Sequence, residues 1–284
     1  YWGEEGVLVL VLAGPLASFL FGYLYVARLP QVRPASDPWT GYLRQLIRLG
    51  MALMLAGLVG TLAQLAMRVL VDRELGASAL GHFQAVWLIS MIYVSFVLQA
   101  MASDFYPRLT GVIHDNTATN RVVNEQTEVA LLLSGPVLLA MLGFAPWVID
   151  ALYTREFQPA ADVLRWQVLG DILKVASWPL GFIILAAGDG RTFLISESIS
   201  FLALVALTAL GMPWLGLEAT GIAFVVMYAL YLPWVYWLAR RRSGFRWVPA
   251  VRRLLLMQLM AALAVQITIH WSEMLGALLA ASLS

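Results

Sequence analysis

The chain has 284 residues, of which 61% are hydrophobic and 12% charged, and its formal net charge is +1. The apolar share exceeds the roughly one half that is usual in soluble proteins, and a nearly neutral chain gives no reason to expect a nucleic-acid partner. The lack of cysteine excludes disulfides, iron–sulfur clusters and zinc sites built on thiolates. We therefore expect an all-α, polytopic helical membrane protein.

Nine apolar runs follow one another along the sequence. A helix needs about 20 mostly apolar residues to cross the hydrocarbon core of a bilayer. We number the runs as spans one to nine: 6–27, 49–71, 80–104, 122–144, 160–186, 190–211, 217–239, 254–271 and 274–283. The sequence opens on Tyr1 without an initiating Met, and span nine is too short to cross, so we expect a segment of a longer protein.

Arginines in the connections between spans predict the orientation. The connections after spans two, four, six and eight carry only Arg73 and Arg155. Those after spans one, three, five and seven carry thirteen: Arg28, Arg33, Arg44, Arg48, Arg108, Arg121, Arg191, Arg240, Arg241, Arg242, Arg246, Arg252 and Arg253. Because positive loops stay in the cytoplasm, we expect the arginine-rich connections there and the first residue on the opposite side.

Two connections have the composition of linkers. The first contains Pro30, Pro34 and Pro38, which cannot continue a helix. The second follows span seven and is rich in arginine. We therefore expect four parts: span one at 1–27, a cytoplasmic linker at 28–48, a six-span bundle at 49–239, and a basic linker with an appended, truncated helix pair at 240–284.

Proline interrupts four of the spans, at Pro15, Pro136, Pro179 and Pro233. Each proline frees a carbonyl that lipid cannot satisfy, so a neighbouring helix or water must do so. Proline is commoner in membrane helices than in soluble ones, but kinked helices also act as hinges beside the sites of many transporters. The sequence leaves both interpretations open.

Span five is the most polar of the set, with Asp162, Arg165, Asp171 and Lys174, the only lysine in the chain. Asp171 and Lys174 lie near its middle, where an ionised side chain costs about 3 kcal/mol on insertion scales. Their spacing puts them on one face of a helix, where they can pair. Such a pair is either a clamp between helices or part of a water-filled cavity that binds an anionic substrate or exchanges a proton.

Two further charged residues lie inside spans. Glu197 is two turns into span six, where a carboxylate needs a partner such as Lys174 or must be protonated. Arg68 is one turn from the outer end of span two, where it either faces the cavity or extends to the membrane surface. The three histidines of the chain show no metal-ligand spacing, so we expect no metal site.

Enzyme signatures are absent from the sequence. It lacks a glycine-rich phosphate loop, a nucleophile elbow and paired histidines on a helix, and no segment outside the spans is long enough for a soluble catalytic domain. We therefore expect a transporter that uses no cofactor.

Short motifs accompany the spans from Leu75 onward. They are Leu75-Gly76, Leu80-Gly81-His82-Phe83-Gln84, Asp104-Phe105-Tyr106-Pro107-Arg108-Leu109, Asn124-Glu125-Gln126, Gly135-Pro136, Leu152-Tyr153, Glu156-Phe157, Trp178-Pro179-Leu180-Gly181 and Ala186-Ala187-Gly188. With these motifs the sequence resembles the Wzx-type O-antigen and polysaccharide flippases, a branch of the superfamily that also holds the multidrug and toxic compound extrusion (MATE) transporters. The resemblance implies two six-helix bundles around a central cavity, with span one ending the N-terminal bundle and spans two to seven forming the C-terminal bundle.

The resemblance also implies a function. A complete protein of this kind exports an oligosaccharide carried on undecaprenyl diphosphate across the inner membrane of a Gram-negative bacterium, which places residue 1 in the periplasm. The anionic head group then needs cations in the cavity, from Lys174, Arg165 and Arg68, while the tail needs an opening to the membrane lipid.

Energy for export would come from an ion gradient, because the chain has no nucleotide site. Asp171 or Glu197 would couple export to a proton or sodium gradient. Two alternatives stay open: a drug or metabolite antiporter of the same fold, and a membrane glycosyltransferase or ligase that acts on lipid-linked sugars.

Overall fold

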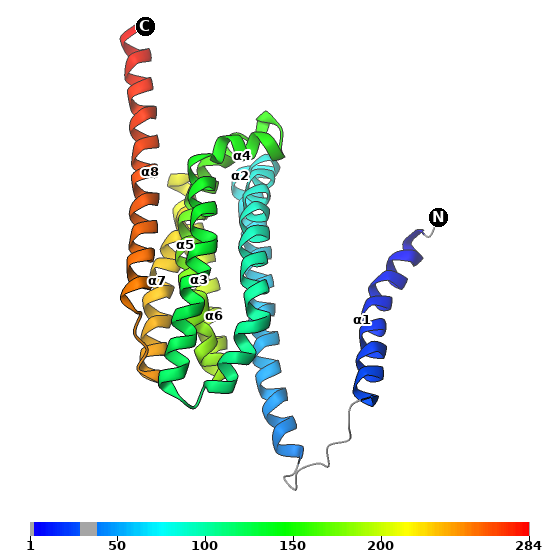
Figure 1. Ribbon diagram of the computed structural model, residues 1–284. Helices are drawn as coiled ribbons and strands as arrows, with labels where there is room; N and C mark the ends of the chain where they lie inside the picture. Colours follow the sequence, from blue (N-terminus) through cyan, green and yellow to red (C-terminus); the bar gives the residue numbers. More distant parts are fainter. Residues whose placement is uncertain (1–2, 29–38, 284) are drawn as a thin grey trace. The chain divides into compact units, whose positions relative to one another are not determined.

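The computed structural model describes residues 3–28 and 39–283, and within these ranges the chain is helical and has no strand (Figure 1). Among the residues searched, six helices are long and apolar enough to cross a membrane. The predicted class, an all-α polytopic membrane protein, is therefore confirmed. The chain divides into two compact units, Tyr1–Arg44 and Gln45–Ser284.

The first unit contains helix α1 (Gly3–Ala27), which includes Pro15 and matches predicted span one. Helix α2 begins at Trp39, so the last part of the linker predicted at 28–48 is helical and the prediction is wrong there. The reason is that no proline follows Pro38 until Pro107. The three prolines of the predicted linker lie outside the described residues.

Helix α2 (Trp39–Val112) consists of two helical arms that meet at Gly76. Gly76 has φ 84° and ψ 175°, a conformation open to glycine because it has no Cβ. The chain reverses there, and Figure 1 shows the two arms of α2 folded back on each other. Met67 and Val71 of the first arm pack with Phe83 of the second. The two arms are predicted spans two and three.

Four long helices complete the expected six spans of the bundle. They are α3 (Asn116–Gly143), α5 (Ala160–Ala186), α6 (Gly190–Leu215) and α7 (Glu218–Ser243), with the short helices α4 (Ala145–Leu152) and η1 (Arg155–Phe157) between α3 and α5. Asp115 caps α3, because its carboxylate accepts hydrogen bonds from the backbone N–H groups of Thr117 and Ala118.

Helix α8 (Pro249–Leu283) is a single helix. The helix pair predicted from spans eight and nine is therefore wrong at this point. The predicted boundary lies at the polar residues Ser272 and Glu273, which interrupt the apolar run. Polar residues do not break a helix, and neither glycine nor proline occurs between residues 254 and 275. The division of the remaining chain into bundle and linkers stays a prediction.

Helix α5 lies at the centre of the second unit and packs against α3 and α7. In an 18-residue apolar stretch of α5, 83% of the residues are buried, whereas in the corresponding stretch of α6 only 17% are. The contact with α7 is close: a Cβ on Gly221 would lie 2.6 Å from the Cβ of Trp166 and 2.9 Å from the carbonyl oxygen of Val163. The most polar predicted span is thus the one most shielded from lipid.

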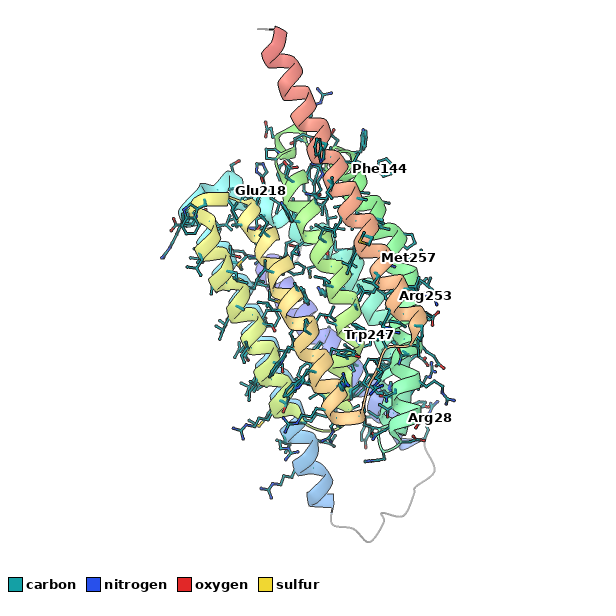
Figure 2. All side chains as sticks on the ribbon, turned by 90° about the vertical axis from the view of Figure 1, so that its left-hand side faces the viewer. Arg28, Phe144, Glu218, Trp247, Arg253 and Met257 are labelled. Carbon is teal, nitrogen blue, oxygen red and sulfur yellow. The ribbon has the colours of Figure 1, made fainter. Side chains whose placement is uncertain are left out.

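Within the second unit, residues from the arginine-rich connections lie together at one end, where Arg242 Nη2 also donates to the Ala187 carbonyl (3.5 Å). Asn120 Nδ2, near the start of α3, donates a hydrogen bond to the Ser243 carbonyl at the end of α7 (3.0 Å). Arg48 Nη2 of α2 donates to the Gly188 carbonyl between α5 and α6 (3.4 Å). Glu218, at the start of α7, lies toward the opposite end (Figure 2).

Candidate functional site

A cavity of about 310 Å³ lies between both arms of α2 and helices α5, α6 and α7; we call it the bundle cavity. Its charged lining residues are Lys174 of α5 and Glu197 of α6, and Gln64 and Ser177 add polar groups. Aromatic rings supply much of the remaining wall: Trp87, Trp178, Phe182, Phe193, Phe201, Phe224, Tyr228 and Tyr231. A pocket lined mainly by apolar and aromatic side chains, with a few polar groups, is the usual form of a ligand site.

The ammonium group of Lys174 faces weak partners. Its Nζ lies 3.3 Å from the sulfur of Met91 and 5.9 Å from the ring centroid of Phe224. Among the described residues, no carboxylate lies within 4.0 Å of this nitrogen. A thioether is a poor acceptor and an ammonium has three hydrogens to donate. Lys174 therefore offers a positive charge that the surrounding side chains satisfy only in part.

Asp171 is buried outside the cavity lining, with none of its surface exposed. Ser90 Oγ, on the second arm of α2, donates a hydrogen bond of 2.5 Å to its Oδ2. Its Oδ1 has no hydrogen-bond partner among the described residues. The direct pair expected with Lys174 is not formed, because Asp171 points into the contact with α2 whereas the longer Lys174 side chain reaches the cavity.

Glu197 shares the bundle cavity with Lys174, so the structure brings these two predicted residues together. Its Oε1 accepts a hydrogen bond of 2.6 Å from the hydroxyl of Tyr231 on α7. At the preceding position, Ser196 Oγ accepts a hydrogen bond of 3.1 Å from Trp234 Nε1. Two polar contacts therefore join α6 to α7 beside the cavity, and the partner of Glu197 is a tyrosine that the sequence analysis did not consider.

The two arginines expected in the cavity lie elsewhere. Arg165 is buried near the start of α5, outside the cavity lining, and forms an ion pair of 2.6 Å with Asp162. Arg68 is exposed and lines a small hollow of about 10 Å³. That hollow shares Trp87 and Phe201 with the bundle cavity. Arg68 is thus next to the cavity, and Arg165 is not part of it.

The aromatic lining is not among the predicted site residues, although its spacing along the sequence indicates it. Trp178 and Phe182 are four residues apart on α5, and Phe193, Glu197 and Phe201 repeat with the same spacing on α6. Phe224, Tyr228 and Tyr231 follow a spacing of four and three on α7. Such spacings place side chains on one face of a helix. Three aromatic faces beside polar residues indicate a lined cavity.

His82 has a structural role at the arginine-poor end. Its Nε2 lies 2.9 Å from the Glu156 carbonyl oxygen, and its ring meets Phe157 edge-on with centroids 5.1 Å apart. These contacts tie the second arm of α2 to η1. In the part of the chain searched, no three His, Asp or Glu side chains gather as metal ligands.

Solved structures of membrane transporters share this fold. The chain resembles the crystal structure of MATE in complex with MaL6, with a TM-score of 0.70 and 17% identity over 83% of this chain and 54% of that one. A MOP superfamily transporter from Pyrococcus furiosus gives 0.60 and 16% over 78% and 52%. The expected MATE-like fold is confirmed.

Sequence comparison then defines the family. The family model described as polysaccharide biosynthesis protein matches residues 2–162, and the chain belongs to this family. It is 24% identical over 251 residues to the lipid III flippase of Escherichia coli (strain K12), covering 85% of this chain and 59% of that protein. It is 24% identical over 120 residues to the teichuronic acid biosynthesis protein TuaB of Bacillus subtilis (strain 168), which is 42% of this chain and 25% of TuaB. The chain thus spans little more than half the length of the flippase.

Proposed function

We propose that the full-length protein is a transporter, and not an enzyme, that moves an oligosaccharide carried on undecaprenyl diphosphate across the bacterial inner membrane. The family, the likeness to a lipid III flippase and the MATE-like fold support this proposal. The observation that carries it is Lys174, a cation with weak partners in an aromatic cavity inside a membrane bundle.

The chemistry of the bundle cavity suits this substrate. Flat aromatic rings such as Trp178 and Phe182 can pack against the C–H faces of sugar rings, and Lys174 attracts an anionic phosphate or an acidic sugar. Charge in the cavity acts strongly because the surrounding helices lower the local dielectric. The N-terminal bundle implied by the resemblance would supply the other wall of the transport path.

The proposed orientation places the arginine-rich end in the cytoplasm and residue 1 in the periplasm. Arg253 and Thr154 are exposed, and lie in the α8 and α4–η1 regions. A cysteine at Arg253 in the full-length protein should react with a membrane-impermeant thiol reagent only from the cytoplasm, and one at Thr154 only from outside. Opposite labelling at both sites would reverse the proposed orientation.

Coupling to a proton or sodium gradient is part of the proposal, and Glu197 is better placed for it than Asp171. Glu197 lines the bundle cavity, whereas Asp171 is enclosed between α5 and α2. We expect Glu197→Gln to abolish the dependence of export on the ion gradient. Unchanged gradient dependence in both Glu197→Gln and Asp171→Asn would remove the two carboxylates from coupling.

Charge variants of Lys174 test the proposed function. Export of saccharide to the cell surface should fall at least tenfold in Lys174→Met at normal protein abundance, and Lys174→Arg should retain part of it because the charge is kept. The double variant Lys174→Met/Asp171→Leu separates two roles of Lys174. If Lys174 only balances the buried carboxylate of Asp171, the double variant restores export, whereas a substrate-binding Lys174 predicts that it does not. Full export from the double variant would contradict the substrate role.

A drug or metabolite antiporter of the same fold is the second candidate, and Glu197 favours it. A carboxylate beside the rings of Tyr228 and Tyr231 suits an organic cation. The two candidates differ in the charge of the ligand. An organic cation that binds the purified full-length protein and loses binding in Glu197→Gln but not in Lys174→Met would favour the antiporter.

A further inference from the structure

A second hollow, of about 250 Å³, lies between α6 and α7 and opens to the outside of the unit. We call it the α6–α7 groove; its lining residues are Ser196, Ile199, Ser200, Ala203, Met227, Leu230, Tyr231 and Trp234. Ile199 is 57% exposed and Leu230 64% exposed. In a helix pair that crosses the membrane, these side chains meet hydrocarbon.

The polar atoms in the α6–α7 groove are already satisfied. Ser200 Oγ donates a hydrogen bond of 2.9 Å to the Ser196 carbonyl on the same helix. Ser196 Oγ accepts from Trp234 Nε1 at 3.1 Å. The remaining lining is aliphatic or aromatic. The groove therefore presents an apolar surface against which a hydrocarbon chain can pack, and no site for a charged head group.

The α6–α7 groove and the bundle cavity share a wall. Tyr231 and Met227 line both hollows, and the Tyr231 hydroxyl is held by Glu197 on the cavity side. Tyr231 and Met227 therefore separate the bundle cavity from the apolar groove. The small hollow beside Arg68 also shares lining with the cavity, but its 10 Å³ is too small for a chain.

We propose that the α6–α7 groove binds the polyisoprenyl chain of the lipid-linked saccharide while the head group occupies the bundle cavity, and that Tyr231 is part of the wall between them. The inference rests on the proposed function. An amphiphile whose head group enters the cavity must keep its tail in hydrocarbon. The α5 side of the cavity cannot serve, because α5 is buried against α3 and α8. Because Tyr231 and Met227 line both hollows, a chain attached to a head group in the cavity can reach the groove directly, and we therefore assign the substrate's own chain as the occupant.

A photo-crosslinking experiment in the full-length protein tests this proposal. Benzoylphenylalanine replaces Ala203, which lines the groove, or Leu210, which lies two turns along the same helix, is 66% exposed and is outside the groove. Membranes carry lipid-linked saccharide labelled in its isoprenoid chain. We expect at least five times more label on the protein with the group at Ala203 than at Leu210.

Filling the groove gives a second, functional readout. Ala203→Trp should slow export at least fivefold at normal abundance, and Leu210→Trp should leave it unchanged. Equal labelling at the two positions, crosslinks to phospholipid or to protein only, or normal export by Ala203→Trp would each overturn the groove proposal. Export by the unaltered protein is measured in the same membranes. If it is present while these tests fail, only the groove is rejected; if it is absent, the proposed function fails as well.

Discussion

The two sides of α5 differ in how they use polar residues. On the side of α3 and α8, Gln258 Nε2 donates to the Leu131 carbonyl (2.7 Å) and Ser134 Oγ donates to the Ala130 carbonyl (2.7 Å). On the side of α6 and α7, Lys174 and Glu197 line a cavity. Polar residues in a membrane bundle are therefore not sites by themselves. What separates these examples is that the Gln258 and Ser134 donors bond to backbone carbonyls, whereas Lys174 and Glu197 face a hollow.

The largest effect should come from separating α5 from α7, since α5 makes its most extensive contact with α7. Gly221→Leu places a side chain where Trp166 and the Val163 carbonyl leave no room. We expect almost complete loss of folded full-length protein, measured by size-exclusion chromatography of a fluorescent fusion. Gly111→Leu, where nothing lies within 4 Å of a new Cβ, is the matched control. Normal yield of Gly221→Leu would contradict this close contact.

A smaller effect is expected where the second arm of α2 contacts α5. Ser90→Ala removes the hydrogen bond to the buried carboxylate of Asp171. Loss of a hydrogen bond to a charged group costs about 2 kcal/mol, so the melting temperature should fall by several degrees. Ser90→Ala/Asp171→Leu should recover it, because no carboxyl is then left without its donor. An unchanged melting temperature in the single variant would show that this bond does not hold α2 to α5.

The smallest effect should come from the side of α5 that faces α3 and α8. Gln258→Leu removes the bond from α8 to the Leu131 carbonyl. Hydrogen bonds between membrane helices contribute about 0.6 kcal/mol on average, so the melting temperature should drop only slightly and export should stay normal. Reduced export at normal abundance would show that α8 takes part in transport, and the contrast between the two sides of α5 would not hold.

The positions of the spans could be predicted from the sequence. Predicted span five, 160–186, coincides with α5, and predicted span six, 190–211, falls within α6. Apolar length decides these bounds, and Pro159 and Gly188 flank α5. The same criterion failed at Ser272 and Glu273, because hydropathy detects a polar interruption but not whether the backbone stays helical.

The partners inside the bundle could not be predicted from one helix alone. Spacing along α5 suggested that Asp171 pairs with Lys174, but Ser90 on another helix holds Asp171 instead. Likewise, the sequence suggests Lys174 as a partner for Glu197, whereas the hydrogen bond to Glu197 comes from the Tyr231 hydroxyl on α7. Which face of a helix meets a neighbour depends on packing between helices distant in sequence. The sequence nevertheless singles out Lys174 and Glu197, which both line the bundle cavity, because charge in mid-membrane is costly wherever it points; their role in transport stays a prediction.

Binding of the substrate to the purified full-length protein tests most directly whether the cavity side is the functional one. The dissociation constant of an undecaprenyl diphosphate-linked saccharide is measured for the unaltered protein, Lys174→Met, Lys174→Arg and Gln258→Leu. We predict that Lys174→Met weakens binding at least tenfold, about 1.4 kcal/mol, that Lys174→Arg weakens it less, and that Gln258→Leu leaves it unchanged. An unaltered dissociation constant in Lys174→Met would contradict the assignment of the bundle cavity as the head-group site.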